Sequence, residues 1–219
     1  MAVTTKKVGI TRESIITAFM GYMAEHGQVP KSIYGFCKNN KIKEQDFYGF
    51  FGSVEGIQKA IWEDFFTNAH SLIIKNGDYD TMSSKDKMLT FLFTFFEVLT
   101  LNRTYVLISL NESHGIFRTL DQLKGLRVQV KSFAKDLIMD GNALKKSKLG
   151  QHPVGLFSEG AWVQLLFLLR FWVKDGSPAF EKTDLAIEKS VNTIFDLFDH
   201  TPLDNIIDFG KFMYRETTR

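Results

Sequence analysis

The sequence predicts an all-α protein, and three observations support this fold class. Apolar residues recur at helical spacing along most of the chain, whereas the long alternating patterns of β-strands are absent. Only 4 of the 219 residues are proline, so few positions interrupt a helix. Hydrophobic residues make up 44% of the chain, with 21 phenylalanines among them, and can therefore fill a large core between helices.

The first predicted helices lie near the N-terminus. Helix one follows Thr11, whose hydroxyl suits an N-cap, and stops at Gly27, a residue type that ends helices. Two short helices are expected at about 32–39 and 43–50, with a polar turn between them. Ser53 then caps a long fourth helix, which we expect to connect two parts of the chain.

The remainder of the chain predicts a larger helical body. Strongly apolar segments favour helices at about 84–99, 105–110, 117–139, 158–174, 182–198 and 203–214. The polar, glycine-rich stretch 141–155 predicts a loop. The predicted domains are residues 1–52 and 77–219, joined by a connecting helix over 53–76.

The segment from Lys31 to Ile57 has the layout of a helix-turn-helix, a motif that inserts its second helix into the major groove of DNA. The charge distribution points the same way. Residues 1–60 hold eight Lys and Arg against five Asp and Glu, although the whole chain carries a net charge of only +2. This bias favours a nucleic-acid contact near the N-terminus. Ordinary scatter of surface charge explains the bias equally well, and both readings stay open.

The same segment resembles the helix-turn-helix of the TetR family of bacterial transcriptional regulators. Ser32 stands at the polar start of the second helix and Ile42 at the apolar position of the turn. Phe47, Tyr48 and Phe51 match the end of the recognition helix. The resemblance implies a TetR-like fold, with an N-terminal three-helix DNA-binding domain and a C-terminal helical domain for ligand binding and dimerisation.

The resemblance also implies a function and partners. It suggests a ligand-responsive transcriptional regulator, a repressor that binds palindromic double-stranded operator DNA and is released by a small hydrophobic effector. The homodimer is expected to form through the apolar helices at about 158–174 and 182–198.

Several positions depart from the family pattern. Lys41 replaces the glycine of the turn, and Lys43 replaces the serine that caps the recognition helix, at a cost of about 1 kcal/mol. Glu44 and Asp46 place negative charge where the helix should approach phosphates, and Val54 replaces a lysine. These departures leave a second reading open: a protein of the same fold that binds a lipid or hydrophobic metabolite and has lost DNA recognition.

Candidate DNA contacts follow from each residue's place in the motif. Side chains near the start of the recognition helix read base edges, Tyr48 can donate a hydrogen bond to a phosphate, and lysines fix the position on the backbone. The predicted DNA-binding residues are Lys31, Ser32, Lys41, Lys43, Gln45, Asp46, Tyr48 and Lys59, and Lys6, Lys7 and Arg12 are further candidates. The alternative for each is a solvated helix residue or, for Tyr48, simple packing.

A ligand cavity in the C-terminal part is expected to be lined by aromatic side chains, with few polar groups to orient an apolar ligand. The predicted ligand-binding residues are Phe95, Phe96, Asn111, His114, Phe133, Trp162, Phe167 and Arg170. Core packing is the alternative for the aromatic residues. For Arg170 it is a surface or interface arginine whose aliphatic stem is buried.

The sequence predicts no enzymatic site, metal site or cofactor. The five histidines have no metal-ligand spacing, Cys37 suits a helix core rather than a nucleophile, and no glycine-rich phosphate loop is present. The N-terminal residues lack the apolar run of a signal peptide, and no apolar run approaches the roughly 20 residues that span a membrane. We therefore expect a cytoplasmic protein without a membrane span.

Overall fold

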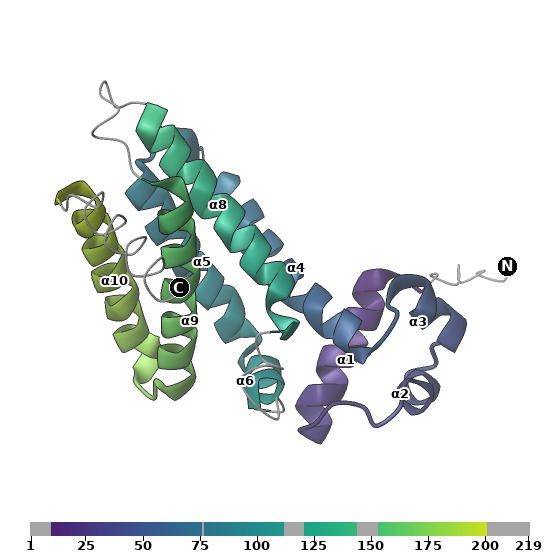
Figure 1. Cartoon of the computed structure of the whole chain (residues 1–219). Helices are drawn as coiled ribbons and strands as arrows, with labels where there is room; N and C mark the ends of the chain where they lie inside the picture. The colour runs from purple at the N-terminus through teal and green to yellow at the C-terminus, as the bar shows by residue number, and fades with distance from the viewer. Residues whose placement is uncertain (1–9, 76, 112–120, 144–152, 201–219) are drawn as a thin grey trace, which may run out of the picture. The chain divides into compact units, whose positions relative to one another are not determined.

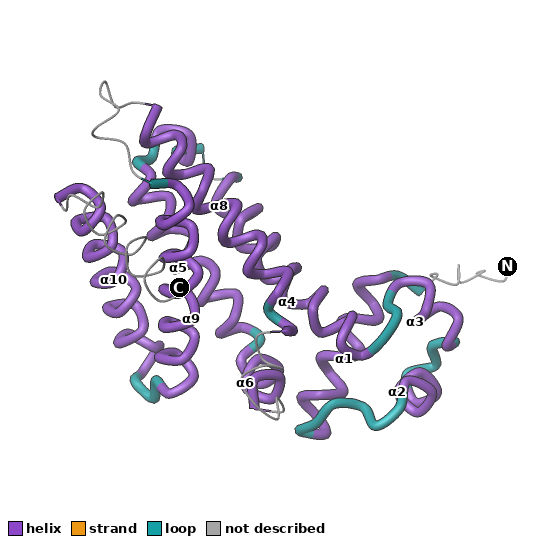
Figure 2. Tube along the Cα trace, viewed as in Figure 1, coloured by secondary structure: helices purple, strands orange, loops and turns teal. Residues whose placement is uncertain are grey.

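The computed structural model describes residues 10–75, 77–111, 121–143 and 153–200. Over these residues every regular element is an α-helix or a short 3₁₀ helix (Figures 1 and 2). The predicted all-α class is therefore confirmed.

The chain forms two compact units, each built from two stretches of sequence. The first unit comprises Met1–Leu72 and Thr94–Gln129. The second comprises Ile73–Phe93 and Val130–Arg219. The expected domain limits at residues 52 and 76 stay a prediction.

The first unit begins with helix α1, Arg12–His26, whose ends are both capped as the sequence predicts. The Thr11 hydroxyl accepts a hydrogen bond from the Ser14 backbone N–H, and the Ser14 hydroxyl oxygen accepts one from the Thr11 backbone N–H. These reciprocal bonds satisfy two of the donors that a helix start leaves unpaired. At the other end Gly27 has φ of 65°, the left-handed conformation that glycine adopts readily.

Two seven-residue helices follow, α2 (Ile33–Asn39) and α3 (Glu44–Phe50). The Ser32 hydroxyl caps α2 by accepting from the Gly35 backbone N–H at 3.1 Å. No side chain caps α3, in agreement with the loss expected from Lys43. The turn before α3 holds Lys41 at φ of 57°, where glycine would be at ease and a lysine is strained.

An aromatic core holds α1, α2 and α3 together. The Phe36 ring meets the Phe19 ring edge-on at 5.7 Å and the Phe47 ring at 6.2 Å, measured between centroids. Cys37 is buried beside them, as predicted for a core residue, and its burial raises the pKa of its thiol. These contacts leave the opposite sides of α2 and α3 facing solvent.

Helix α4 spans Val54–Ile74, and the Ser53 hydroxyl caps it by accepting from the Gly56 backbone N–H at 3.1 Å. Its apolar side buries Ile57, Ile61 and Trp62. Asp64 also lies on α4, and its two carboxylate oxygens accept hydrogen bonds from the Arg12 guanidinium at 2.6 and 2.9 Å.

Three further helices contribute to the first unit: α5 (Ser84–Leu101), α6 (Arg103–Asn111) and α8 (Lys124–Ala143). Their largest buried side chains in this unit include Phe95 and Leu99. Helix α6 packs against α1, so the N-terminal helices are in direct contact with the helical body of the same unit.

The second unit contains the strongly apolar helix α9 (Val154–Lys174) and α10 (Glu181–His200), which pack side by side (Figure 1). The unit also contains the start of α5, the larger part of α8, and two 3₁₀ turns, η1 (Tyr79–Thr81) and η3 (Pro178–Phe180). Core side chains of α9 in this unit include the fully buried Trp172.

The predicted loop at 141–155 is wrong at both ends. Helix α8 continues to Ala143, because Gly141 and its neighbours pack against α5, where the Ser84 hydroxyl donates to the Leu137 carbonyl at 2.8 Å. Tertiary packing therefore outweighs the low helix propensity of glycine. Helix α9 begins at Val154 rather than at about 158, since Pro153 directly precedes it, with φ fixed at −71° and no N–H to satisfy.

Of two other expected helices, one is tested only in part and one is not tested. The helix expected from residue 117 begins at Lys124, and residues 112–120 lie outside the described residues. The helix expected at 203–214 lies outside them entirely.

Among the described helices, α9 is long and apolar enough to match a membrane span by length and composition, and so are α5 and α6 if that bent pair is taken together. The buried core residues of α9 are equally what a core helix of a bundle requires.

Candidate nucleic-acid interface

The outward side of α2 and α3 is the candidate DNA-reading surface. Phe47 points into the core, and this fixes the rotation of α3 so that Lys43, Gln45 and Tyr48 are exposed. Glu44 and Asp46 are half-buried. The first turn of α3 therefore presents one cation, one amide and two carboxylates at the end that a recognition helix directs towards base edges.

The predicted backbone contacts on α2 and the turn are also exposed. Lys31 precedes α2 and Lys41 follows it, and both side chains are exposed. Ser32 is exposed too, but its hydroxyl already accepts the capping hydrogen bond of α2. The structure thus brings seven of the eight predicted residues, Lys31 to Tyr48, to one short stretch of helix-turn-helix.

Lys59, the eighth predicted DNA contact, lies on α4 in an ion pair. Its Nζ is 2.8 Å from the Asp121 carboxylate, which also pairs with Lys124. Its role as a phosphate contact stays a prediction. Arg12 is the first residue of α1, as expected from the Thr11 cap, and its guanidinium pairs with the Asp64 carboxylate and lies over the Phe51 ring. Its role as a DNA contact stays a prediction. Lys6 and Lys7 lie outside the described residues.

Exposed aromatic rings are a feature of this surface that the sequence analysis did not assign. Tyr34 is 60% exposed and Phe50 is 47% exposed. The Lys38 ammonium lies 6.0 Å from the centre of the Tyr34 ring. Tyr34 and Lys38 are four residues apart on α2, a spacing from which their contact could have been predicted. Rings interleaved with lysines can stack on sugars or bases while the lysines meet phosphates.

The Asp121 carboxylate, which precedes α8 in the chain, forms ion pairs with Lys59 of α4 and with Lys124 of α8, all within the first unit. Hydrogen bonds from Lys124 and Lys59 stabilise its charged form and lower its pKa to about 2. The carboxylate is partly exposed, so solvent screens the pair. The Lys59 ammonium on α4 is therefore engaged with Asp121.

We expect the Asp121→Asn variant to be less stable than the parent near neutral pH, with a smaller difference in acid. The folded-state pKa of about 2 lies below the ordinary 3.8, so this carboxylate stabilises the folded state above about pH 4 and loses that contribution as the pH falls towards 2. Urea midpoints measured at about pH 7 and about pH 3 should therefore converge in acid. Asp196→Asn, at an exposed position on α10, is the control. A difference independent of pH would contradict the assigned pairing.

The predicted ligand-binding residues fall into three groups. Phe95 and Phe96 are buried in the first unit, and Phe133 and Trp162 are buried in the second, where the Phe133 ring lies 4.7 Å from that of Phe91. Phe167 and Arg170 are exposed on α9. The Asn111 side chain and His114 lie outside the described residues. Their assignment to a ligand cavity stays a prediction.

Among the described residues, no group of three His, Cys, Asp or Glu side chains is placed to hold a metal ion.

An all-helical chain with an N-terminal helix-turn-helix and a larger helical body defines the class of TetR-like regulators. Residues 87–213 match the sequence family described as the tetracyclin repressor-like C-terminal domain, and this match covers more than half of the chain. The chain therefore belongs to the tetracycline-repressor-like family. Its helix-turn-helix lies outside the matched residues and is assigned from the motif and the helices themselves.

A solved structure supports the fold independently. The protein is similar to a crystal structure from Syntrophomonas wolfei that is assigned to the TetR-family transcriptional regulators, with a TM-score of 0.65 and 21% sequence identity. The alignment covers 85% of this chain and 94% of that one. No curated protein sequence matches the chain. Regulators of this family generally act as DNA-binding dimers in the cytoplasm rather than as enzymes, and family and fold together support a transcriptional regulator.

Proposed function

We propose that the protein is a ligand-responsive transcriptional repressor that binds a palindromic operator as a homodimer and is released by a small hydrophobic effector. The observation that carries the proposal is the orientation of α3. Phe47 is buried completely, and its neighbour Tyr48 is 52% exposed beside Lys43 and Gln45. A helix fixed in this way presents polar and cationic side chains to a groove while its apolar side anchors it.

The chemistry of the exposed residues suggests how an operator would be read. An amide such as that of Gln45 can form two hydrogen bonds with adenine, and a carboxylate such as that of Asp46 can accept one from the amino group of cytosine. Lys31, Lys41 and Lys43 would meet phosphates and supply sequence-independent affinity. The Tyr48 hydroxyl would donate to a phosphate at the end of the helix.

Exposed apolar residues on α9 and α10 support the proposed dimer. They are Leu156, Val163, Leu185 and Leu197. Clustered apolar side chains on two long helices are typical of a surface that another protein covers. A second copy of the chain would cover them with its own α9 and α10. Such a dimer must place its two recognition helices about 34–36 Å apart to enter successive major grooves.

The contacts inside the first unit suggest how an effector would act. The Arg12–Asp64 pair fastens α1 to α4, and α6 packs against α1. A change in α4 or α6 on effector binding would therefore move α1 and with it the helix-turn-helix. An effector that binds better to the state with unsuitable helix spacing shifts the population away from DNA.

A second candidate function is favoured by the acidic start of α3. Glu44 and Asp46 in its first turn, together with the strained Lys41, weaken the case for approach to phosphates. The alternative is a protein of the same fold that binds a lipid or hydrophobic metabolite and ignores DNA.

Fluorescence anisotropy of the full chain with duplex DNA from upstream of its own gene separates the two candidates. A regulator should bind saturably, and six to ten phosphate contacts would lower the affinity by roughly 10³- to 10⁵-fold between about 50 and 200 mM salt. Lys43→Gln should reduce the salt slope by about one for each lost contact. Lys189→Gln, at an exposed position on α10, is the matched control. Absence of any salt-sensitive DNA binding would overturn the regulator and leave the hydrophobic-ligand protein.

A further inference from the structure

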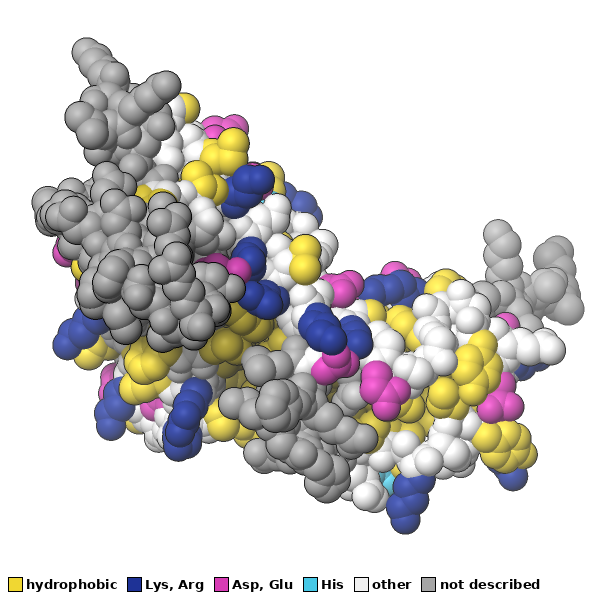
Figure 3. All heavy atoms as spheres, in the orientation of Figure 1, with side chains coloured by type: hydrophobic (Ala, Val, Ile, Leu, Met, Phe, Trp, Pro, Cys, Tyr) yellow, Lys and Arg dark blue, Asp and Glu magenta, His cyan; other side chains and the backbone are white. Residues whose placement is uncertain are grey.

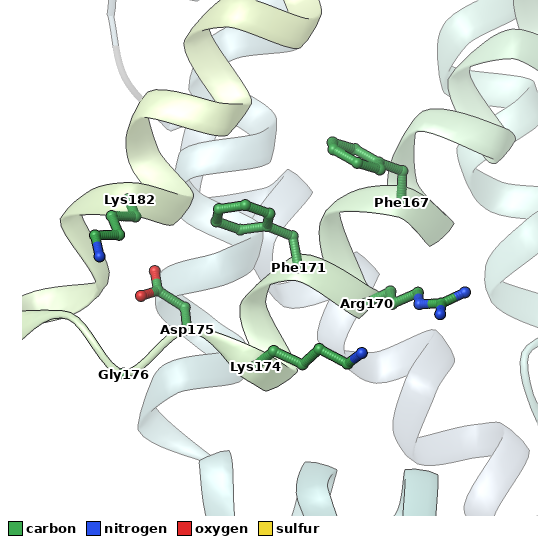
Figure 4. A pocket seen from close by; sticks show the side chains of 7 residues that line it. All are labelled: Phe167, Arg170, Phe171, Lys174, Asp175, Gly176 and Lys182. Atoms are coloured by element: carbon green, nitrogen blue, oxygen red, sulfur yellow. The ribbon is translucent and has the colours of Figure 1, made fainter.

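The second unit has a partly open groove of about 560 Å³ where α9 ends and α10 begins. Its lining residues are Phe167, Arg170, Phe171, Lys174, Asp175, Gly176 and Lys182. In Figure 4 the two phenylalanine rings extend from successive turns of α9, with Lys182 on one side and Arg170 and Lys174 on the other. A volume of this size suits a small organic molecule.

The groove is lined by three cations and one carboxylate, so its net charge is positive. Among the residues that the structure describes, no acidic side chain forms an ion pair with Arg170, Lys174 or Lys182. The groove does contain the Asp175 carboxylate, but Ser177 and Thr183 occupy both of its oxygens. Each of these residues donates its backbone N–H and its hydroxyl, at distances of 2.7 to 2.9 Å. Asp175 therefore serves the turn into α10, and its negative charge offsets part of the positive charge of the groove.

The floor of the groove is apolar and accessible. Phe167 is 53% exposed, and its ring centroid lies 6.3 Å from that of Phe171. Figure 3 shows hydrophobic side chains at the surface near the lower part of α9, with Lys and Arg side chains at their edge. The exposed Phe167 and the half-buried Phe171, with cations at their edge, are complementary to a molecule with an apolar body and an anionic head.

We propose that this groove binds a free single-chain carboxylate amphiphile, such as a fatty acid anion. Its apolar chain would lie on Phe167 and Phe171, and its carboxylate would accept hydrogen bonds from the Arg170 guanidinium, with Lys174 on the same side of the rings. A planar guanidinium can hold a carboxylate through two parallel bonds, which an ammonium cannot. The inference rests on the proposed function in one respect, because it names the class of the proposed effector. The groove lies on α9 and α10, the helices proposed to pair in the dimer, so a bound ligand would act on the dimer.

Titration calorimetry of the full chain with dodecanoate below its micelle concentration tests this site without DNA. We expect saturable binding with one molecule per chain. The double variant Arg170→Gln with Lys174→Gln should weaken it by about tenfold or more, because it removes charged hydrogen bonds to the head group. Lys135→Gln with Lys189→Gln, two exposed lysines of the second unit outside the groove, gives the matched loss of charge. Dodecanol, with the same chain and no charge, should bind much more weakly than dodecanoate.

Three results would overturn the site. The first is equal affinity of the parent and the groove variant, and the second is equal binding of dodecanol and dodecanoate. The third is binding to vesicles of anionic phospholipid without binding of free dodecanoate, which would assign the surface to a membrane. Light scattering of the ligand-free groove variant adds a further check, since a changed monomer–dimer distribution would assign the cations to subunit pairing instead. These measurements contain no DNA, so their failure leaves the regulator proposal standing, and loss of DNA binding leaves them untouched.

Discussion

Phe47→Ala is expected to destabilise the N-terminal helices by about 3–5 kcal/mol, the usual cost of removing a buried phenylalanine side chain. Phe47 is 0% exposed, and its ring contacts three other rings. Centroid distances are 6.2 Å to Phe36, 5.6 Å to Tyr48 and 5.8 Å to Phe51. Because α3 has only seven residues and no side-chain cap, this packing is its main support. We expect the variant to lose α3 and, with it, any DNA binding.

Urea unfolding followed by circular dichroism measures this effect, and Phe50→Ala is the control. Phe50 lies on the same helix but is 47% exposed, so its truncation should cost much less than that of Phe47. Similar losses for the two variants would contradict the assigned orientation of α3. If the first unit unfolds separately from the second, the urea curve will show an additional transition. The Phe47→Ala substitution should then lower the midpoint of that transition alone.

Tyr48→Ala is expected to leave the fold nearly unchanged and to weaken operator binding by about 10- to 100-fold, in line with the loss of a hydrogen bond to a charged group. Tyr48 follows Phe47 in sequence, yet half of its side chain is exposed. The two neighbouring variants therefore have opposite expected phenotypes. One loses stability and the other loses affinity for DNA.

Anisotropy with operator DNA measures the second effect, with Tyr48→Phe to separate the hydroxyl from the ring. If the hydroxyl donates to a phosphate, the Phe variant should behave like the Ala variant; if the ring packs on a sugar, it should resemble the parent protein. Tyr79→Phe, in the η1 turn of the second unit, is the matched control. Unchanged DNA affinity in Tyr48→Ala would remove Tyr48 from the interface.

Local sequence signals predicted the N-terminal helices well. Thr11, Gly27 and Ser53 each act through their own side chain or backbone conformation on the adjacent turn, and they mark helix ends in the structure as expected. The buried positions Phe47 and Cys37 followed from helical spacing in the same way. Information of this kind is contained in a few consecutive residues, so it can be read from the chain directly.

Features that depend on distant residues were harder to predict. The start of α9 was placed about four residues late, because a proline before a helix was taken as part of a loop. The pairing of Arg12 with Asp64 was not predicted, since the two residues lie 52 positions apart in the chain. Arg170 was singled out as a charge on an apolar helix, but the groove around it depends on Lys182 from the next helix. Such juxtapositions arise only when helices pack.

The Arg12–Asp64 pair has a consequence for the exchange of parts between related regulators. A hybrid protein that joins the helix-turn-helix of this chain to a foreign body after residue 52 would keep Arg12 and discard Asp64, leaving a half-buried guanidinium without its carboxylate. A fusion junction further along α4, beyond Asp64, would keep both residues of the pair in the hybrid protein. In this protein the smallest exchangeable module is longer than the motif that reads DNA, and it includes the first half of α4.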